Sequence, residues 1–245
     1  THSHSVASHH ALSTIEEMLR AANAKGIRGL VLSDHHPSLR FEGDDYFINA
    51  PDEAFFHVFC QRFKPQDSYG IKLFKSIELN ILDHDPWVSP LSDRFDNLFD
   101  LKIAGIHSFP HLFSVTSDIC FNTELVVNAI RSGEKRKFDI FTHPVALHFP
   151  LDIKLVVEEC VERGIALEVN NSNLLYKKEI APLVKSMLKE VVRCGGHIAV
   201  GSDAHMASEV GRFSEAIKIL EDVAFPSELI VNSSLGRFIS FISEY

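Results

Sequence analysis

The chain has 245 residues, 45% of them hydrophobic, and includes 19 phenylalanines, which is enough for a large core in one domain spanning residues 1–245. Its 33 acidic and 24 basic residues give a net charge of −9 with histidine neutral, and this balance argues against nucleic acid as a partner. The apolar runs fall well short of the roughly 20 residues that cross a membrane, so no membrane partner is expected.

The four cysteines lie apart from the histidine clusters and form no Cys-x-x-Cys pair; they are Cys60, Cys120, Cys160 and Cys194. They are typical of idle thiols in a reducing compartment, and because no signal peptide is visible we expect a cytoplasmic protein. The phenylalanine content leaves self-association into a homo-oligomer open. A strand normally precedes a His-x-His pair like the one that opens this chain, so we also expect residues upstream of Thr1 in the full-length protein.

Helical and strand patterns alternate along the chain. Ser13 and Glu16 have capping-box spacing, which predicts a helix that runs to about Lys25. Polar loops are expected over 35–50 and 108–120. Further helices are expected over 52–64, 123–132, 152–163, 179–193, 208–222 and 234–243, and strands over 28–33, 72–78, 101–106, 138–142, 165–169 and 197–201.

With a strand at the N-terminus, this order gives about seven βα units, which is typical of a parallel sheet covered by helices. An open sheet would place its ligand at one switch point, whereas here nearly every strand ends in a metal-type side chain. The pattern therefore favours a closed TIM-like barrel of the α/β class, with its site at the C-terminal ends of the strands.

Nine nitrogen or oxygen donors follow the ends of the predicted strands or lie close behind them. They are His2, His4, His10, His35, Glu78, His107, His143, Asp203 and His205. His2 and His4 point to the same side of an extended chain because they are two residues apart. Converging strands would bring all nine to one point, which predicts a metal site.

Other interpretations of single residues stay open. Glu78 could form a structural salt bridge, and Asp203 could cap the helix expected at 208–222. His10 and His35 each lie beside another histidine, so the register of either could be shifted by one. The remaining histidines, expected to be surface or structural residues, are His57, His84, His111, His148 and His197.

Short motifs in the same order resemble the PHP superfamily (polymerase and histidinol phosphatase), close to its small single-domain bacterial phosphatases. The matching stretches are H-S-H-S-V-A-S-H-H-A-L-S-T, L-S-D-H-H-P, S-I-E-L-N-I, I-A-G-I-H, T-H-P, L-E-V-N-N-S and G-S-D-A-H. Each is short, but together they span almost the whole chain and fill every ligand position expected from the family. The acidic strand that usually precedes the first histidine is absent.

The resemblance implies a distorted (βα)7 barrel with three divalent metal ions, most often Zn²⁺ and sometimes Mn²⁺ or Fe²⁺. One ion would take His2, His4, Glu78 and Asp203. A second would share Glu78 and add His107 and His143. The third would take His10, His35 and His205.

The function expected from these features is metal-dependent hydrolysis of a small phosphomonoester by a metal-bound hydroxide. Asp34 and Asp203 are candidates to orient that water or accept its proton, although Asp34 could equally fix a histidine tautomer. Candidate substrate-binding residues follow two strand ends and are His36, Arg40, and Asn170 to Ser172 with Asn171 as the principal one. Lys177 and Lys178 could meet an anionic tail of the substrate or simply be solvated.

Two alternatives remain. A metal amidohydrolase acting on C–N bonds also begins with His-x-His and ends with Asp, but it usually needs a lysine on its fourth strand, where this chain has His107. A non-enzymatic metal-binding regulatory domain is the second alternative, and the complete ligand set argues against it.

Overall fold

The computed structural model describes residues 1–42, 47–64, 69–109, 111–114 and 116–243, so residues 43–46, 110 and 115 of the two predicted loops lie outside the described residues. The helices are α1 Ile15–Ala24, α2 Glu53–Arg62, α3 Asp93–Asp96, α4 Ile119–Arg131, α5 Ile153–Glu162, α6 Asn171–Tyr176, α7 Ala181–Cys194, α8 Ser214–Asp222 and α9 Leu235–Ser243. The strands are β1 Gly29–Leu32, β2 Phe41–Glu42, β3 Phe47–Ile48, β4 Lys72–Lys75, β5 Glu78–Asn80, β6 Ile103–Gly105, β7 Ile140–Phe141, β8 Ala166–Asn170 and β9 Ile198–Gly201.

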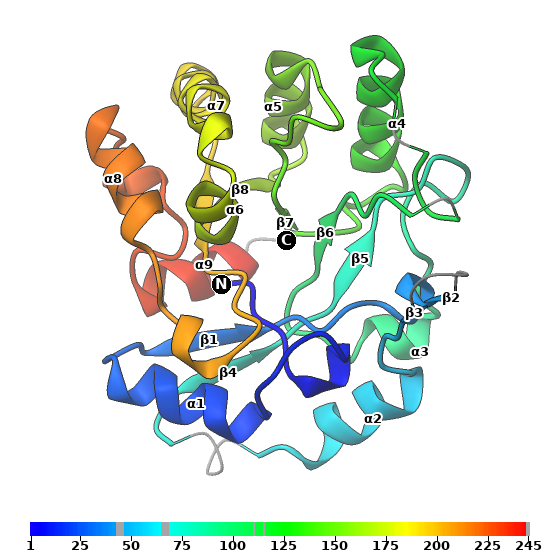
Figure 1. The fold of residues 1–245 in the computed structure, drawn as a ribbon, viewed down its shortest axis with the longest axis vertical. Coiled ribbons are helices and arrows are strands. Elements are labelled where there is room, and N and C mark those ends of the chain that lie inside the picture. The colour runs from blue at the N-terminus through cyan, green and yellow to red at the C-terminus, as the bar shows by residue number, and fades with distance from the viewer. Residues whose placement is uncertain (43–46, 65–68, 110, 115, 244–245) are drawn as a thin grey trace.

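The strands form two parallel sheets and one small hairpin. β1 pairs with β4, and β5 to β9 pair in sequence order, all parallel, whereas β2 and β3 form an antiparallel hairpin. Helices α4, α5, α7 and α8 line the five-stranded sheet, while α1 and α2 lie beside the β1–β4 pair (Figure 1). The expected α/β class with parallel strands is therefore confirmed.

The first residues of the chain lie between the two sheets. Ser3 forms a parallel bridge with Ala204, just after β9, and its carbonyl accepts a hydrogen bond from the backbone N–H of Ser33, just after β1, at 2.8 Å. On the other side, His35 forms a parallel bridge with Glu78 at the start of β5. These contacts bring the segments that follow β9 and β1 against the N-terminal segment.

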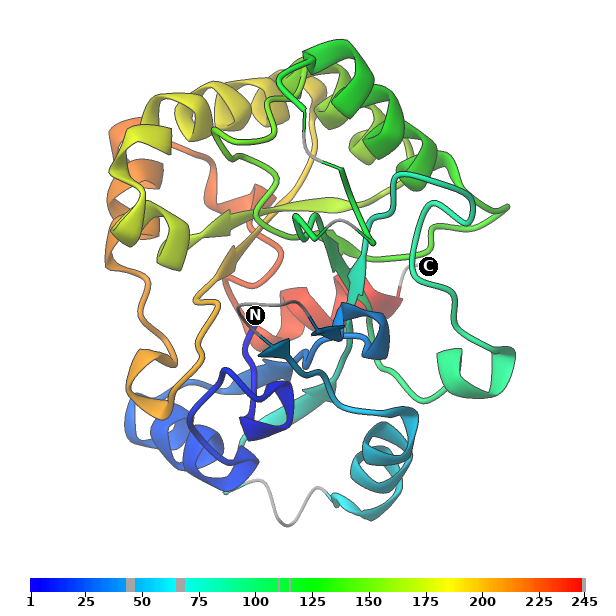
Figure 2. The ribbon, with the colours of Figure 1, turned by 45° about the vertical axis from the view of Figure 1, so that its right-hand side comes forward.

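The opposite ends of the strands are covered by α9. Phe238 and Phe241 are buried there against strand residues that include Phe74, Ile103 and Ala166. Figure 2 shows α9, in red, crossing beneath the strands. Helix α9 therefore covers the N-terminal ends of the strands, and the C-terminal ends are available to form a site.

Two predicted boundaries are wrong for reasons that the structure explains. The capping box uses Thr14 and Glu17, one residue later than expected, because the Ser13 hydroxyl is buried and accepts a hydrogen bond from the N–H of Ala207 at 3.0 Å. The helix expected at 208–222 begins only at Ser214, because Gly211 has a positive φ of 71° that no helix continues through.

The predicted strand 72–78 is two strands. It bends at Ser76, whose backbone N–H still bonds the carbonyl of Leu32 at 2.9 Å, while Ile77 already accepts from Ile103 at 3.1 Å. The chain thus leaves β1 and joins β6 within two residues.

Helices α3 and α6 and the β2–β3 hairpin were not expected from the sequence. Helix α4 begins at Ile119, earlier than expected, because the Asp118 side chain caps it. No helix in the described residues is long and apolar enough to cross a membrane.

Candidate metal centre

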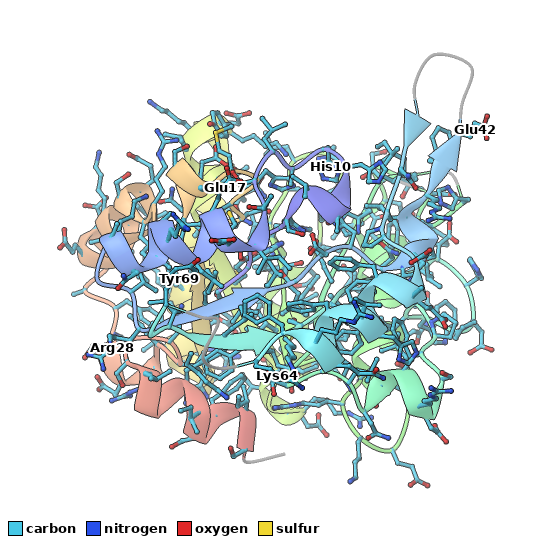
Figure 3. The ribbon with its side chains drawn as sticks, turned by 90° about the horizontal axis from the view of Figure 1, so that it is seen from below. His10, Glu17, Arg28, Glu42, Lys64 and Tyr69 are labelled. Atoms are coloured by element: carbon cyan, nitrogen blue, oxygen red, sulfur yellow. The ribbon has the colours of Figure 1, made fainter. Side chains whose placement is uncertain are left out.

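The nine predicted donors meet at the C-terminal ends of the strands. His2 and His4 lie on the N-terminal segment, and His10 follows the 3-10 turn Val6–Ser8. The other six begin a strand or come two to four residues after the end of one, at β1, β5, β6, β7 and β9; they are His35, Glu78, His107, His143, Asp203 and His205. In Figure 3, His10 lies on the turn before α1. Arg28 lies just before β1, at the end of that strand opposite to the cluster.

Glu78 is the centre of the cluster. It has no exposed surface, and five histidine side chains surround its carboxylate. The distances from its oxygens are 3.0 Å to His35 Nδ1, 3.1 Å to His143 Nε2, 3.4 Å to His2 Nε2, 3.5 Å to His4 Nε2 and 3.7 Å to His107 Nε2. Such convergence on one buried carboxylate is suited to a ligand shared between cations.

Asp203 completes the other side of the cluster. Its Oδ1 lies 3.4 Å from Nε2 of both His2 and His4 and 3.6 Å from Nδ1 of His205. His10 and His35 approach each other with their Nε2 atoms 3.2 Å apart, and the rings of His10 and His205 are 4.9 Å apart between centroids.

The donor set fits divalent metal ions. Three groups of ligand atoms each lie within 4.8 Å of one another: His2, His4 and Glu78; His35, Glu78 and His107; and His4, His35 and His205. Oε2 of Glu78 and Nδ1 of both His4 and His107 are buried without a hydrogen-bond partner, which is costly unless another ligand is bound. His35 belongs to two groups, so the geometry links the sets that the resemblance assigns to separate ions.

Burial and charge divide the histidines into two protonation classes. Burial lowers the pKa of His4, His35 and His107 to about 3, so these imidazoles are neutral. Burial also lowers the pKa of His2, but the carboxylates of Glu168, Asp203 and Glu78 outweigh it and hold that pKa well above its usual value. Burial also lowers the pKa of His143, but the hydrogen bond and charge of Glu78 together with the charge of Asp203 outweigh it and raise that pKa.

Both carboxylates of the cluster are ionised. Burial alone would raise the pKa of Glu78 and Asp203, but the surrounding histidines hold both well below their usual values, with His2 making the largest contribution in each case. The cluster therefore offers negative oxygens and, at His4, His35 and His107, neutral nitrogens, which are the protonation states that metal ligands need.

Glu168 on β8 contacts the cluster, and the strand-end pattern did not identify it. Its buried carboxylate accepts hydrogen bonds from Nδ1 of His2 at 2.9 Å and from the backbone N–H of His143 at 2.8 Å. It also accepts from Nδ2 of Asn170, which donates to Asp203 Oδ2 at 3.1 Å. Metal-binding histidines usually donate their second N–H to such a carboxylate. An acid inside the apolar run of the predicted strand 165–169 was therefore the feature of the sequence that could have identified Glu168.

The backbone around the cluster is strained and tightly packed. His2, His143 and Asp203 have positive φ angles of 61°, 35° and 48°, which cost about 1–3 kcal/mol each for such residues and persist only where the surroundings enforce them. A Cβ at Gly105 would lie 2.4 Å from Cε1 of His143, so only glycine leaves room for that ring.

Asp34, a predicted catalytic residue, lies beneath the first turn of the chain. Its carboxylate accepts hydrogen bonds from the backbone N–H and hydroxyl of Ser5, both at 2.8 Å, and from the hydroxyl of Ser8 at 2.6 Å. Burial raises its pKa to about 6. These bonds hold the turn that carries His10, and the catalytic role of Asp34 stays a prediction.

A cavity of about 330 Å³ opens above the cluster. Seven of the nine donors line it, all except His2 and His4. Its apolar lining residues are Leu39, Ile48, Ile106, Phe109, Ala146 and Phe149, and its polar rim consists of Ser108, His148, Asn173 and Lys177. His148, expected to be a surface or structural residue, thus lies at the site.

The three predicted substrate-binding residues make other contacts. Nδ1 of His36 lies 2.8 Å from the Ser38 hydroxyl, and Nε of Arg40 donates to the carbonyl of Ala50 at 3.1 Å. Oδ1 of Asn171 accepts from the backbone N–H groups of Glu215 and Ala216 in the first turn of α8. None of the three is among the described residues that line the cavity, and their role in binding stays a prediction.

Comparison with known proteins places the chain in a family. Residues 1–136 match the PHP domain. A probable phosphatase of Caldanaerobacter subterraneus subsp. tengcongensis is 33% identical over 248 residues, covering 100% of this chain and 90% of the relative. The probable phosphatase YcdX of an Escherichia coli strain is 35% identical over 245 residues, covering 98% and 92%.

A solved structure supports the fold. The histidinol phosphate phosphatase of Lactococcus lactis, in complex with zinc, L-histidinol and phosphate, superposes with a TM-score of 0.63 at 16% identity and covers 92% of this chain and 93% of its own. The match to the family domain, the full-length identity to its members and the shared fold agree, and the chain belongs to the PHP domain family.

Proposed function

We propose that this chain is a metal-dependent phosphatase that hydrolyses a small phosphomonoester at a trinuclear divalent metal centre. The observation that carries the proposal is the buried Glu78 carboxylate with five histidines around it, beneath an open cavity. Relatives that cover nearly the whole chain are named probable phosphatases, which supports the same reaction class.

The proposal includes a closed, distorted (βα)7 barrel. Its support is the sequence of contacts around the site: β9 meets the N-terminal segment through Ala204, that segment meets β1 through Ser33, and β1 pairs with β4, which bends into β5. β5 to β9 then return to the start. A ring of this kind explains why side chains from all parts of the chain reach one point.

We assign the ligands in three sets, namely His2, His4, Glu78 and Asp203; Glu78, His107 and His143; and His10, His35 and His205. Nitrogen and carboxylate donors suit Zn²⁺, with Mn²⁺ or Fe²⁺ as alternatives. When bound, such ions offset the charge of phosphate oxygens and lower the pKa of water enough to supply hydroxide near neutral pH.

Side chains of this chain would transfer the proton, orient a ligand and exclude water. Asp203 is ionised, lines the cavity and contacts His2, His4 and His205, so it can accept a proton from the attacking water. Glu168 fixes His2 with its Nε2 toward the cluster. The apolar wall of the cavity excludes water beside the reacting phosphate.

The substrate is a small phosphorylated compound rather than nucleic acid, given the acidic composition and the limited cavity. L-Histidinol phosphate belongs in any screen, because the Lactococcus neighbour is a histidinol phosphate phosphatase. The four cysteines are unpaired, which supports the cytoplasm as the compartment.

The test combines metal analysis with two substrate panels. Protein loaded with Zn²⁺ or Mn²⁺ should bind about three ions and release phosphate from phosphomonoesters. Hydrolysis of cyclic amides alone would favour the amidohydrolase alternative. Tight metal binding without turnover on either panel would favour a regulatory metal-binding domain.

A further inference from the structure

The cavity above the metal centre has two chemically different sides. Apolar side chains form one wall, with Ile106 and Phe149 buried and Phe109 partly exposed. Ser108, His148, Asn173 and Lys177 form the polar rim. A ligand whose phosphate lies at the histidine cluster must therefore place its body along the apolar wall and its far end at the rim.

The charges of the cavity are also unequal. Among the described residues that line it, the acids are Glu78 and Asp203, and both belong to the metal centre. Lys177 is the one lysine or arginine among those same lining residues. In the part of the chain that the structure describes, no carboxylate forms an ion pair with Lys177, so its charge is available to a ligand.

His148 adds a hydrogen-bonding group to the rim beside Lys177. Its Nε2 lies 3.1 Å from the hydroxyl of Ser108. Burial, and then the charge of Lys177, lower its pKa. A neutral histidine beside a lysine can donate or accept a hydrogen bond while the lysine supplies the charge.

The backbone of Lys177 is connected to the metal centre through helix α6. Its backbone N–H bonds the carbonyl of Asn173 at 2.8 Å, which ends α6. The N-cap of the same short helix is Asn170, whose side chain caps it and also bonds Glu168 and Asp203. One helix of six residues therefore joins the metal centre to the rim.

We propose, on the basis of the phosphatase function above, that the preferred leaving group has an apolar, ring-sized body and ends in an anionic group that pairs with Lys177. A carboxylate and a second phosphate share this chemistry. An ammonium group at the same position would face Lys177 without a rim carboxylate among the described residues, so a substrate such as L-histidinol phosphate is disfavoured.

The experiment compares aryl phosphates that differ only at the far end. The compounds are 4-(2-carboxyethyl)phenyl phosphate, its primary amide, its phosphonate counterpart, and 4-(3-aminopropyl)phenyl phosphate. The methylene groups insulate the phenol, so leaving-group reactivity is closely matched. We expect kcat/KM of the metal-loaded protein to be about fivefold lower for the amide than for the acid, which is the size of effect that loss of a partly exposed ion pair produces. It should be lower still for the amine.

Lys177→Gln should bring the acid-to-amide ratio close to one, whereas the matched control Lys178→Gln should keep the wild-type ratio. Lys178 is the adjacent exposed lysine and does not line this cavity. A higher kcat/KM for the phosphonate than for the carboxylate would identify a second phosphate as the natural group, and the reverse would identify a carboxylate.

Equal rates for acid and amide, or an acid preference that survives Lys177→Gln, would overturn the inference while leaving phosphatase activity intact. Failure to hydrolyse any of the four compounds or any other phosphomonoester by metal-loaded protein would instead overturn the proposed function itself.

Discussion

The side chain of Glu168 on β8 fills the space beside the Cα of Gly201 on the neighbouring strand β9. A Cβ on Gly201 would lie 1.7 Å from Oε1 of Glu168, the oxygen that accepts a hydrogen bond from His2. β8 and β9 pair in parallel here, with Asn170 opposite Gly201. The absence of a side chain at Gly201 is therefore what allows a buried carboxylate to lie beneath the metal centre.

Gly201→Ala should displace Glu168 and with it His2. We expect a loss of stability of about 1–3 kcal/mol, as for overpacking in a rigid core, together with weaker metal binding. Thermal unfolding and metal analysis measure the two effects. Gly236→Ala in α9 is the control, because no atom lies within 4 Å of its added Cβ, and it should be neutral or slightly stabilising. Normal metal content in Gly201→Ala would contradict the packing argument.

Glu168→Gln tests the carboxylate without changing its size. The amide offers one acceptor oxygen where the two carboxylate oxygens receive bonds from His2, His143 and Asn170, so at least one donor loses its partner. We expect metal affinity to fall about 10- to 100-fold, as is typical when the partner of a metal-binding histidine is lost. Competition with a chelator of known affinity measures this, and unchanged affinity would show that Glu168 does not orient His2.

The nine donors could be predicted because parallel strands carry their C-terminal side chains to one edge, whatever the details of the loops. The structure brings all nine together, and their ligation of metal stays a prediction. Glu168 escaped the strand-end pattern because it lies within a strand, where a carboxylate gives no periodic signal. The positive φ angles of His2, His143 and Asp203 could not be predicted either, because tertiary contacts impose them.

Substrate contacts were harder to predict than metal contacts. Asn171 follows a strand end like the donors do, but its side chain caps α8 instead of entering the cavity. Lys177 and Lys178 are adjacent and alike in sequence, and only the end of α6 at Tyr176 decides which of them reaches the rim. Helix α6 itself was not expected, so the sequence had no basis for the choice.

Glu78→Gln should remove the shared ligand of the proposed centre. A neutral amide cannot offset the charge of two cations, so we expect about two of three ions to be lost and activity to fall at least 100-fold. Elemental analysis of the purified variant gives the metal count. Glu124→Gln, at an exposed position on α4, should leave the count unchanged. An unaltered count in Glu78→Gln would rule out the bridging role.

Chelation should lower activity and stability together. Ligands that bind the folded state stabilise it by mass action, about 2.7 kcal/mol when free ligand exceeds Kd by about 100-fold, so the metal-free protein should unfold at a lower temperature. Dialysis against a strong chelator, followed by differential scanning calorimetry and a phosphate-release assay, measures both. Activity and melting temperature should recover on adding Zn²⁺ or Mn²⁺. Full activity with metal confirmed as absent would refute the mechanism.

Metal binding should release protons from two particular histidines. The pKa of His2 is held well above its usual value and that of His143 is raised, so both hold protons over a wider pH range than His4, His35 and His107, whose pKa values are lowered to about 3. A cation must displace the protons that His2 and His143 hold, so affinity should fall as pH drops, and loading should release more protons at about pH 6 than at about pH 8. Isothermal titration calorimetry in buffers of different ionisation enthalpy counts them, and His84→Gln, in an exposed loop, should give the same count. Loading without proton release would show that His2 and His143 are already neutral, and that Glu168 and Glu78 do not hold protons on them.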